Sequence, residues 1–188
     1  MNPRHLTMAE LEAGLDHIRQ SPGRDGLVEM VVRRPQKDGR EVLAEGQLDV
    51  RAGLVGDRWG ADAAGLPFDE ELFVRDTQLT LMNARVVQLV AQSRDRWPLA
   101  GDQLFVDLDL STGNLPTGTR LKVGSAVIEV TAVPHNGCSK FVARYGRDAM
   151  IFVDGPTWKP LRLRGIYAKV VAPGVVRPGD RIAVEGDH

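Results

Sequence analysis

The sequence predicts a mainly β fold, a mixed β-barrel with a few short peripheral helices. Short segments of alternating apolar and polar residues recur at close spacing, and turns rich in glycine and proline separate them. Only a few segments show the three- and four-residue apolar spacing of an amphipathic helix. This combination is typical of β-barrels. The 188 residues are most simply a single domain, 1–188, with the barrel in residues 27–185.

An appended helix is predicted over residues 7–20. It opens with the capping box Thr7-Met-Ala-Glu10 and ends at Ser21-Pro22-Gly23. Its apolar residues fall on one face and are Leu11, Leu15 and Ile18. We expect this helix to cover one end of the core and to carry no chemistry.

The first predicted strand covers residues 27–34. Residues 40–50 form its expected partner across the turn Lys37-Asp38-Gly39. Arg33 and Arg34 stand at the strand end, where arginines either bind an anion or lie in solvent, and a solvated strand end is the interpretation we favour. Residues 61–75 are acidic and lack periodicity, so we expect a surface loop there.

Two further strands and one helix are predicted in the middle of the chain. Residues 78–82 form a short strand, and Asn83 caps a helix with its apolar band at Val86, Val87, Leu89 and Val90. The clearest strand follows at residues 104–110. Its residues alternate, with Leu104, Val106, Leu108 and Leu110 facing one way and Phe105, Asp107 and Asp109 the other.

The last third of the chain predicts a hairpin over residues 120–133 with Gly124-Ser125 as its turn. Residues 163–171 and 180–185 are the closing strands. Between them and the hairpin, Trp158-Lys-Pro160 is a candidate for the rim of a site.

Cys138 is the only cysteine, and it stands where a strand gives way to a predicted helix that ends at Gly146. A thiol in the first turn of a helix feels the positive end of the dipole, which favours its thiolate. Lys140 and Arg144 add positive charge nearby. The alternative is that Cys138 is a small buried hydrophobic residue, as many lone cysteines are.

Composition excludes several classes of protein. The net charge of −1 gives no electrostatic case for binding nucleic acid or an anionic membrane. No apolar run approaches the length of a membrane span, and the first residues lack the apolar core of a signal peptide. One cysteine forms no intrachain disulfide, and the scattered histidines show no zinc-ligand spacing. We expect a cytoplasmic protein.

Several short motifs occur in a fixed order around this cysteine. Gly101-Asp-Gln-Leu104 precedes Cys138, and Arg164-Gly165 and Gly179-Asp180 follow it. This order resembles the MOSC domain, a module of molybdenum cofactor sulfurases that also occurs as free-standing small proteins. The resemblance covers most of the chain and implies the same barrel. It also implies that the chemistry lies on Cys138, either as the protein ligand to molybdenum or as the carrier of a persulfide.

The resemblance further implies which residues bind the molybdenum cofactor (molybdopterin). Asp102 and Gln103 match the acid and amide that point into the cofactor pocket, although Gly-Asp before a strand is also a common turn. Arg164 matches an arginine suited to the cofactor's phosphate, with a structural ion pair as the rival interpretation. Lys140 and Arg58 complete the predicted cofactor-binding set.

Two departures from the family's pattern are visible. Gly56-Asp57-Arg58-Trp59 matches a family motif except that Trp59 replaces its histidine, and Asp57 and Arg58 are as well suited to pair with each other as to contact a ligand. A His-Gly-Gly stretch that relatives often carry near residue 61 has no equivalent.

Three functions remain open. By family analogy, a free-standing relative reduces N-hydroxylated small molecules and receives electrons from a separate electron-transfer partner. A persulfide carrier would instead need a cysteine desulfurase as partner, since the chain is too short to contain a pyridoxal-phosphate domain beside the barrel. The third possibility is a cofactor-binding module without turnover. No ferredoxin-like cysteine set or dinucleotide fingerprint is present, so the chain supplies no electrons itself.

Overall fold

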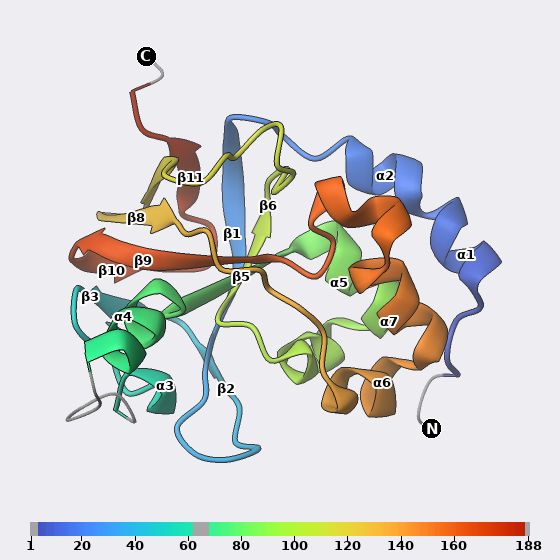
Figure 1. Cartoon of the computed structure of the whole chain (residues 1–188), viewed down its shortest axis with the longest axis horizontal. Helices are drawn as coiled ribbons and strands as arrows, with labels where there is room; N and C mark the ends of the chain where they lie inside the picture. Colours follow the sequence, from blue (N-terminus) through green and yellow to red (C-terminus); the bar gives the residue numbers. More distant parts are fainter. Residues whose placement is uncertain (1–3, 62–67, 187–188) are drawn as a thin grey trace.

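A closed, mixed barrel of seven strands forms the centre of the computed structural model, which describes residues 4–61 and 68–186 (Figure 1). The strand order is β11-β7-β8-β9-β5-β6-β1, and β1 pairs back to β11. The β5–β6 pair is parallel and the other neighbours are antiparallel. The bounds are β1 Asp25–Arg33, β5 Leu79–Asn83, β6 Leu104–Asp107, β7 Arg120–Val123, β8 Ala126–Val130, β9 Ile166–Ala172 and β11 Arg181–Val184.

Four short strands extend this frame. β2 (Glu41–Leu43) adds to β1, and a small second sheet has the order β10-β3-β4. Its strands are β3 Gly46–Asp49, β4 Gly53–Leu54 and β10 Gly174–Val176. The predicted strand 40–50 is therefore divided between two sheets.

Most of the helices gather on one side of the barrel (Figure 1). These are α1 Met8–Ala13, α2 Leu15–Arg19, α5 Ala84–Ala91, α6 Ser139–Tyr145 and α7 Arg147–Asp154. Two 3-10 helices, η1 Arg94–Ala100 and η2 Pro156–Leu161, connect them to the strands, and α3 (Arg58–Ala61) and α4 (Phe68–Asp76) lie apart from this group. None of the helices in the described ranges is long and apolar enough to span a membrane.

The barrel wall separates two apolar cores. Leu104, Val106, Leu108 and Leu110 point into the barrel, whereas Phe105 points outward into the layer beneath the helices. This confirms the alternation predicted for residues 104–110, although ladder pairing ends at Asp107. The cap of α5 is also confirmed, because Asn83 Oδ1 accepts hydrogen bonds from the N–H groups of Arg85 (2.8 Å) and Val86 (3.2 Å).

Two predictions about helices need correction. The predicted helix 7–20 is two helices divided at Gly14, where a Cβ atom would lie 2.6 Å from Leu89 of α5. The approaching atoms belong to the end of the Leu89 side chain, so a larger residue at position 14 would require that side chain to move. The prediction of a loop over 61–75 is wrong for its second half, which is α4, while residues 62–67 lie outside the described ranges. α4 was missed because its sequence shows little periodicity.

Candidate functional site

The loop that carries Cys138 is fixed from behind by α7. Gly137 donates its N–H to Asp154 Oδ2 at 3.1 Å, and a Cβ atom on Gly137 would lie 2.2 Å from Met150 Sδ. The loop therefore packs so tightly on α7 that a side chain at 137 would displace its neighbours. Cys138 follows as the N-cap of α6 and is exposed. The interpretation of Cys138 as a buried hydrophobic residue is thus wrong.

Cys138 opens onto a cavity of about 350 Å³, which we call the thiol cavity. The end of β1 and its turn, β5, the end of η1, the loop after β8, α6 and β9 all contribute to its walls. Of the sequence-predicted residues, Cys138, Lys140 and Arg164 line it together. The remaining lining residues are Arg34, Arg40, Trp59, Thr77, Thr80, Ala100, Gly101, His135, Asn136, Arg144 and Tyr167.

Among the residues that the structure describes, five cationic side chains and no acidic one line the thiol cavity. Lys140 forms an ion pair with Asp38, and Arg144 lies 3.8 Å from the same carboxylate. Arg40 is different, because its guanidinium donates hydrogen bonds to the carbonyl oxygens of Pro98 (3.1 Å) and Gly39 (2.6 Å). Burial, followed by the nearby Arg144 and Arg34 charges, lowers the pKa of Arg40. An anion in the cavity would relieve this crowding of positive charge.

Arg164 forms a buried ion pair with Asp102 and also lines the thiol cavity. Its Nη1 lies 3.1 and 2.8 Å from the two carboxylate oxygens, and its Nη2 donates to the Ala100 carbonyl at 3.1 Å. The Asp102 side chain is completely buried, and burial raises its pKa although Arg164 opposes this. Asp102 therefore acts on the cavity through Arg164, and the structural ion pair foreseen for Arg164 is present.

His135 packs against the same pair. Its ring contacts that of Tyr167 at a tilt of 47°, with centroids 4.5 Å apart, and its Nδ1 lies 3.7 Å from Asp102 Oδ1, beyond hydrogen-bonding distance. Burial, together with Arg164 and Arg34, holds the pKa of His135 well below its usual value. His135 Nδ1 and Arg164 Nε are both buried without a hydrogen-bond partner in the described structure. The neutral imidazole is thus a polar wall of the thiol cavity.

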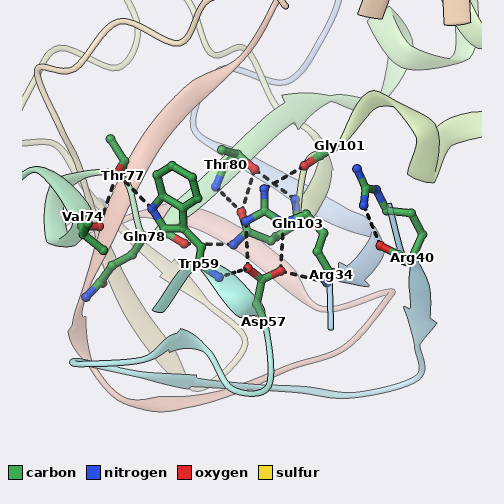
Figure 2. Close-up of polar contacts among 11 residues, drawn as sticks. Arg34, Arg40, Asp57, Trp59, Val74, Thr77, Gln78, Thr80, Gly101 and Gln103 are labelled. Atoms are coloured by element: carbon green, nitrogen blue, oxygen red, sulfur yellow. Dashed lines mark hydrogen bonds and ion pairs between the residues drawn. The ribbon is translucent and has the colours of Figure 1, made fainter. Parts of the chain in front are cut away.

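Gln103 lies beside the cavity rather than in its lining (Figure 2). Its Oε1 accepts hydrogen bonds from the N–H and hydroxyl of Thr80, both at 2.7 Å, and its Nε2 donates to the Gln78 carbonyl at 2.9 Å. All of this lies in the buried interior, so the amide joins the start of β5 to the start of β6. Thr80, which lines the cavity, is held by this amide.

Arg34 was expected in solvent, and this expectation is wrong (Figure 2). Its side chain is 17% exposed and pairs with Asp57 through two nitrogens, each 2.9 Å from a carboxylate oxygen. Asp57 thereby fixes Arg34 against the cavity. Arg33 instead pairs with Glu41 at the surface.

The loop at Gly56 contributes an unexpected residue. Trp59 lines the thiol cavity and donates its Nε1–H to Thr77 Oγ1 at 3.1 Å (Figure 2). Arg58 is exposed, and the cavity lining does not include it. The position at which Trp59 departs from the family motif therefore faces the site.

Sequence reasoning missed Arg40, His135 and Tyr167 as lining residues. Arg40 lies just after a surface turn, where an arginine gives no signal of its own. His135 was visible three residues before Cys138, and its proximity to the cysteine was the available clue. In the described part of the chain, no cluster of three or more His, Cys, Asp or Glu side chains is arranged to hold a metal ion.

Comparison with known families gives one match. The model of the MOSC domain matches residues 69–183, which include Asp102, Gln103, Cys138, Lys140 and Arg164. No curated protein matches the sequence significantly.

Several solved structures have a similar fold. The YuaD protein from Bacillus subtilis is 18% identical, with a TM-score of 0.57 over 85% of this chain and 95% of that one. YiiM from Escherichia coli is also 18% identical, with a TM-score of 0.51 over 86% of this chain and 71% of that one. YiiM from Geobacillus stearothermophilus is 13% identical, with a TM-score of 0.50 and coverages of 87% and 74%. At these identities the likeness concerns the fold alone.

Proposed function

The chain belongs to the MOSC domain family, and from this premise we propose that it binds molybdenum cofactor in the thiol cavity, with Cys138 as the protein ligand to molybdenum. The family is generally associated with this cofactor. The proposal includes an activity, the reduction of N-hydroxylated small molecules. The observation that carries it is the meeting of one exposed thiol with five cationic side chains in one cavity.

The residues present fit the cofactor in charge and in donor type. A soft thiolate is a reasonable ligand for molybdenum because it donates electron density to the metal. The cofactor also carries a phosphate, and Arg40 is a cation that donates hydrogen bonds to carbonyl oxygens. A guanidinium binds phosphate through two parallel hydrogen bonds. We therefore assign the phosphate to the Arg40 side of the cavity, with Arg144 beside it.

The remaining side chains would position and enclose the ligand. Arg164 is locked by Asp102, so it presents a fixed charge. Thr80 and Tyr167 offer hydroxyl groups, and Trp59 and the His135 ring supply flat surfaces suited to a pterin.

When bound, molybdenum would supply a centre able to pass two electrons. Reducing an N-hydroxyl group to N–H consumes two electrons and two protons and releases water. The electrons would come from a separate redox protein, as expected for a chain without an electron carrier of its own.

The persulfide carrier is the second candidate, and the exposure of Cys138 favours it. A sulfur carrier must present its thiol to a cysteine desulfurase. Cys138 is exposed, at the point where the loop ends and α6 begins. In this role the same cations would bind the cofactor that receives the sulfur.

Metal and pterin analysis of protein purified from molybdenum-replete cells tests the proposal. We expect stoichiometric molybdenum and pterin in the native chain, and loss of molybdenum in Cys138→Ser. Molybdenum-free protein whose Cys138 carries the mass of one extra sulfur would favour the carrier. Absence of both pterin and molybdenum, together with an unmodified thiol, would overturn both roles.

A further inference from the structure

A second cavity adjoins the thiol cavity. It has a volume of about 180 Å³ and lies where the end of α7, η2 and the start of β9 meet the loop after β8. His135, Asn136 and Arg164 line both cavities, so they form a shared wall. The function proposed above makes no use of this space.

Two cations line the second cavity without a carboxylate partner in the described ranges, namely Lys159 and Arg162. The Arg162 guanidinium donates to the Leu115 carbonyl at 2.7 Å, and burial lowers its pKa. A half-buried guanidinium that lacks a counter-ion stabilises an anion bound beside it.

Asp154 is the one acidic side chain among the described residues of the lining, and it has a different role. Asp154 accepts the Gly137 N–H and so holds the loop that carries Cys138. Arg164, the third cation, is balanced by Asp102 from behind. The second cavity therefore retains an excess of positive charge.

The backbone of Arg162 supports a role in binding. It has φ 47° and ψ 47°, in the left-handed region, where it ends η2. Glycine is the usual residue for such a cap, and a larger residue held there is strained. Strained residues of this kind concentrate at ligand sites, where the surrounding structure maintains them.

Part of the lining is apolar. Val133, Pro134, Val153 and Ile166 supply hydrocarbon surface to the same cavity. A ligand that satisfies both the cations and this apolar surface has a short apolar body and one anionic group. Inorganic phosphate has no apolar body, so it would interact with the cations but not with the apolar surface.

We propose that the second cavity binds a small carboxylic acid, with its carboxylate toward Lys159 and Arg162 and its apolar body against Val133 and Ile166. Carboxylate matches a guanidinium through two parallel hydrogen bonds. The proposal uses residues of this chain alone, so it stands independently of the molybdenum assignment.

An NMR titration of the full chain with sodium benzoate, at constant pH and ionic strength, tests this. We expect saturable shifts of the backbone amides in residues 131–136 and 159–166. Benzamide, which has the same ring and no charge, should bind roughly tenfold more weakly, the difference that one charge-assisted contact makes. Inorganic phosphate should also bind more weakly than benzoate.

Matched variants test whether Lys159 and Arg162 bind the carboxylate of benzoate. Lys159→Gln and Arg162→Asn should each weaken benzoate binding by about three- to tenfold, since each removes one cation. Asparagine tolerates the left-handed backbone at 162, and thermal unfolding checks that both variants are folded. Lys122→Gln removes a charge from β7, outside both cavities, and should leave the affinity unchanged.

The proposal is overturned if benzoate produces no saturable shift, or if benzamide or phosphate binds as well as benzoate. Equal losses in Lys122→Gln and Lys159→Gln would also overturn it. Molybdenum content plays no part in this measurement, so its failure is distinct from failure of the cofactor proposal.

Discussion

A single nitrogen of Arg164 binds both carboxylate oxygens of Asp102, and both side chains are almost fully buried. The guanidinium forms one side of the thiol cavity, and the carboxylate lies behind it, away from any ligand. Because Arg164 depends on Asp102 for its counter-charge, a substitution of Asp102 would affect the cavity through Arg164.

Asp102→Asn should destabilise the fold by about 3–5 kcal/mol, because it leaves the Arg164 charge buried without a partner. Chemical denaturation measures this directly. Asp25→Asn is the control, since Asp25 pairs with Arg181 at the surface and its loss should change stability far less. Equal losses of stability in the two variants would show that burial of the ion pair does not determine the cost of breaking it.

Gly165→Ala should cost about 3 kcal/mol or more. Its φ is +109°, and a Cβ atom there would lie 2.1 Å from the Leu81 carbonyl oxygen, which is backbone and has little room to move. Gly179→Ala separates the two causes, because Gly179 has φ +91° with open space around it. A similar loss in both variants would show that backbone strain alone is responsible.

Cys138→Ser should abolish molybdenum binding while leaving stability unchanged or raising it by up to about 1 kcal/mol. Cys138 is the N-cap of α6 and makes no capping hydrogen bond, whereas serine is among the best N-cap residues. Thermal unfolding checks the predicted stability, and metal analysis of the same preparation checks the predicted loss of molybdenum.

The double variant Cys138→Ser, Ser139→Cys is the matched control for the thiol. It keeps one thiol and moves it by one residue, so it should not restore molybdenum. Restored metal content would mean that the position of the thiol is unimportant.

His135 should make the fold less stable as pH falls below neutrality. It faces Asp102, Arg164, Arg34 and Tyr167, and its pKa in the folded chain lies well below the usual 6.5. The unfolded chain therefore binds a proton that the folded chain excludes, and stability is lost as pH falls from about 7 toward the folded pKa. The slope contributed approaches about 1.4 kcal/mol per pH unit.

Denaturation of His135→Gln at several pH values tests this slope. The variant should be less sensitive to pH between 7 and 5 than the native chain, whatever its absolute stability. His17→Gln, at an exposed position in α2, should keep the native slope. An unchanged slope in His135→Gln would show that the imidazole binds a proton as readily in the folded chain as in the unfolded chain, contrary to the prediction.

Features encoded by neighbouring residues were predictable from the sequence. The alternation at 104–110, the Asn83 cap and the hairpin turn at Gly124 each depend on a few adjacent side chains. The start of a helix at Cys138 is of the same kind, since it needs only the pattern from 138 to Gly146.

Features made by distant residues were not predictable. Arg34 is held in a half-buried position by Asp57, which lies 23 residues later in the sequence. The amide of Gln103 makes its hydrogen bonds to Thr80 and Gln78. No local pattern in a single sequence indicates that these residues are in contact. Arg40 and Arg144 line the same cavity because the barrel is closed. No local sequence pattern predicts that closure.

The pair of strands that closes the barrel joins segments far apart in the sequence. β1 pairs with β11, and Asp25 binds Arg181 across 156 residues of sequence. Contacts of such separation form slowly, because the loop must be closed before the pairing stabilises it. During synthesis, β1 therefore lacks this partner until β11 (Arg181–Val184) has been made, so the barrel that supports the thiol cavity closes late in folding.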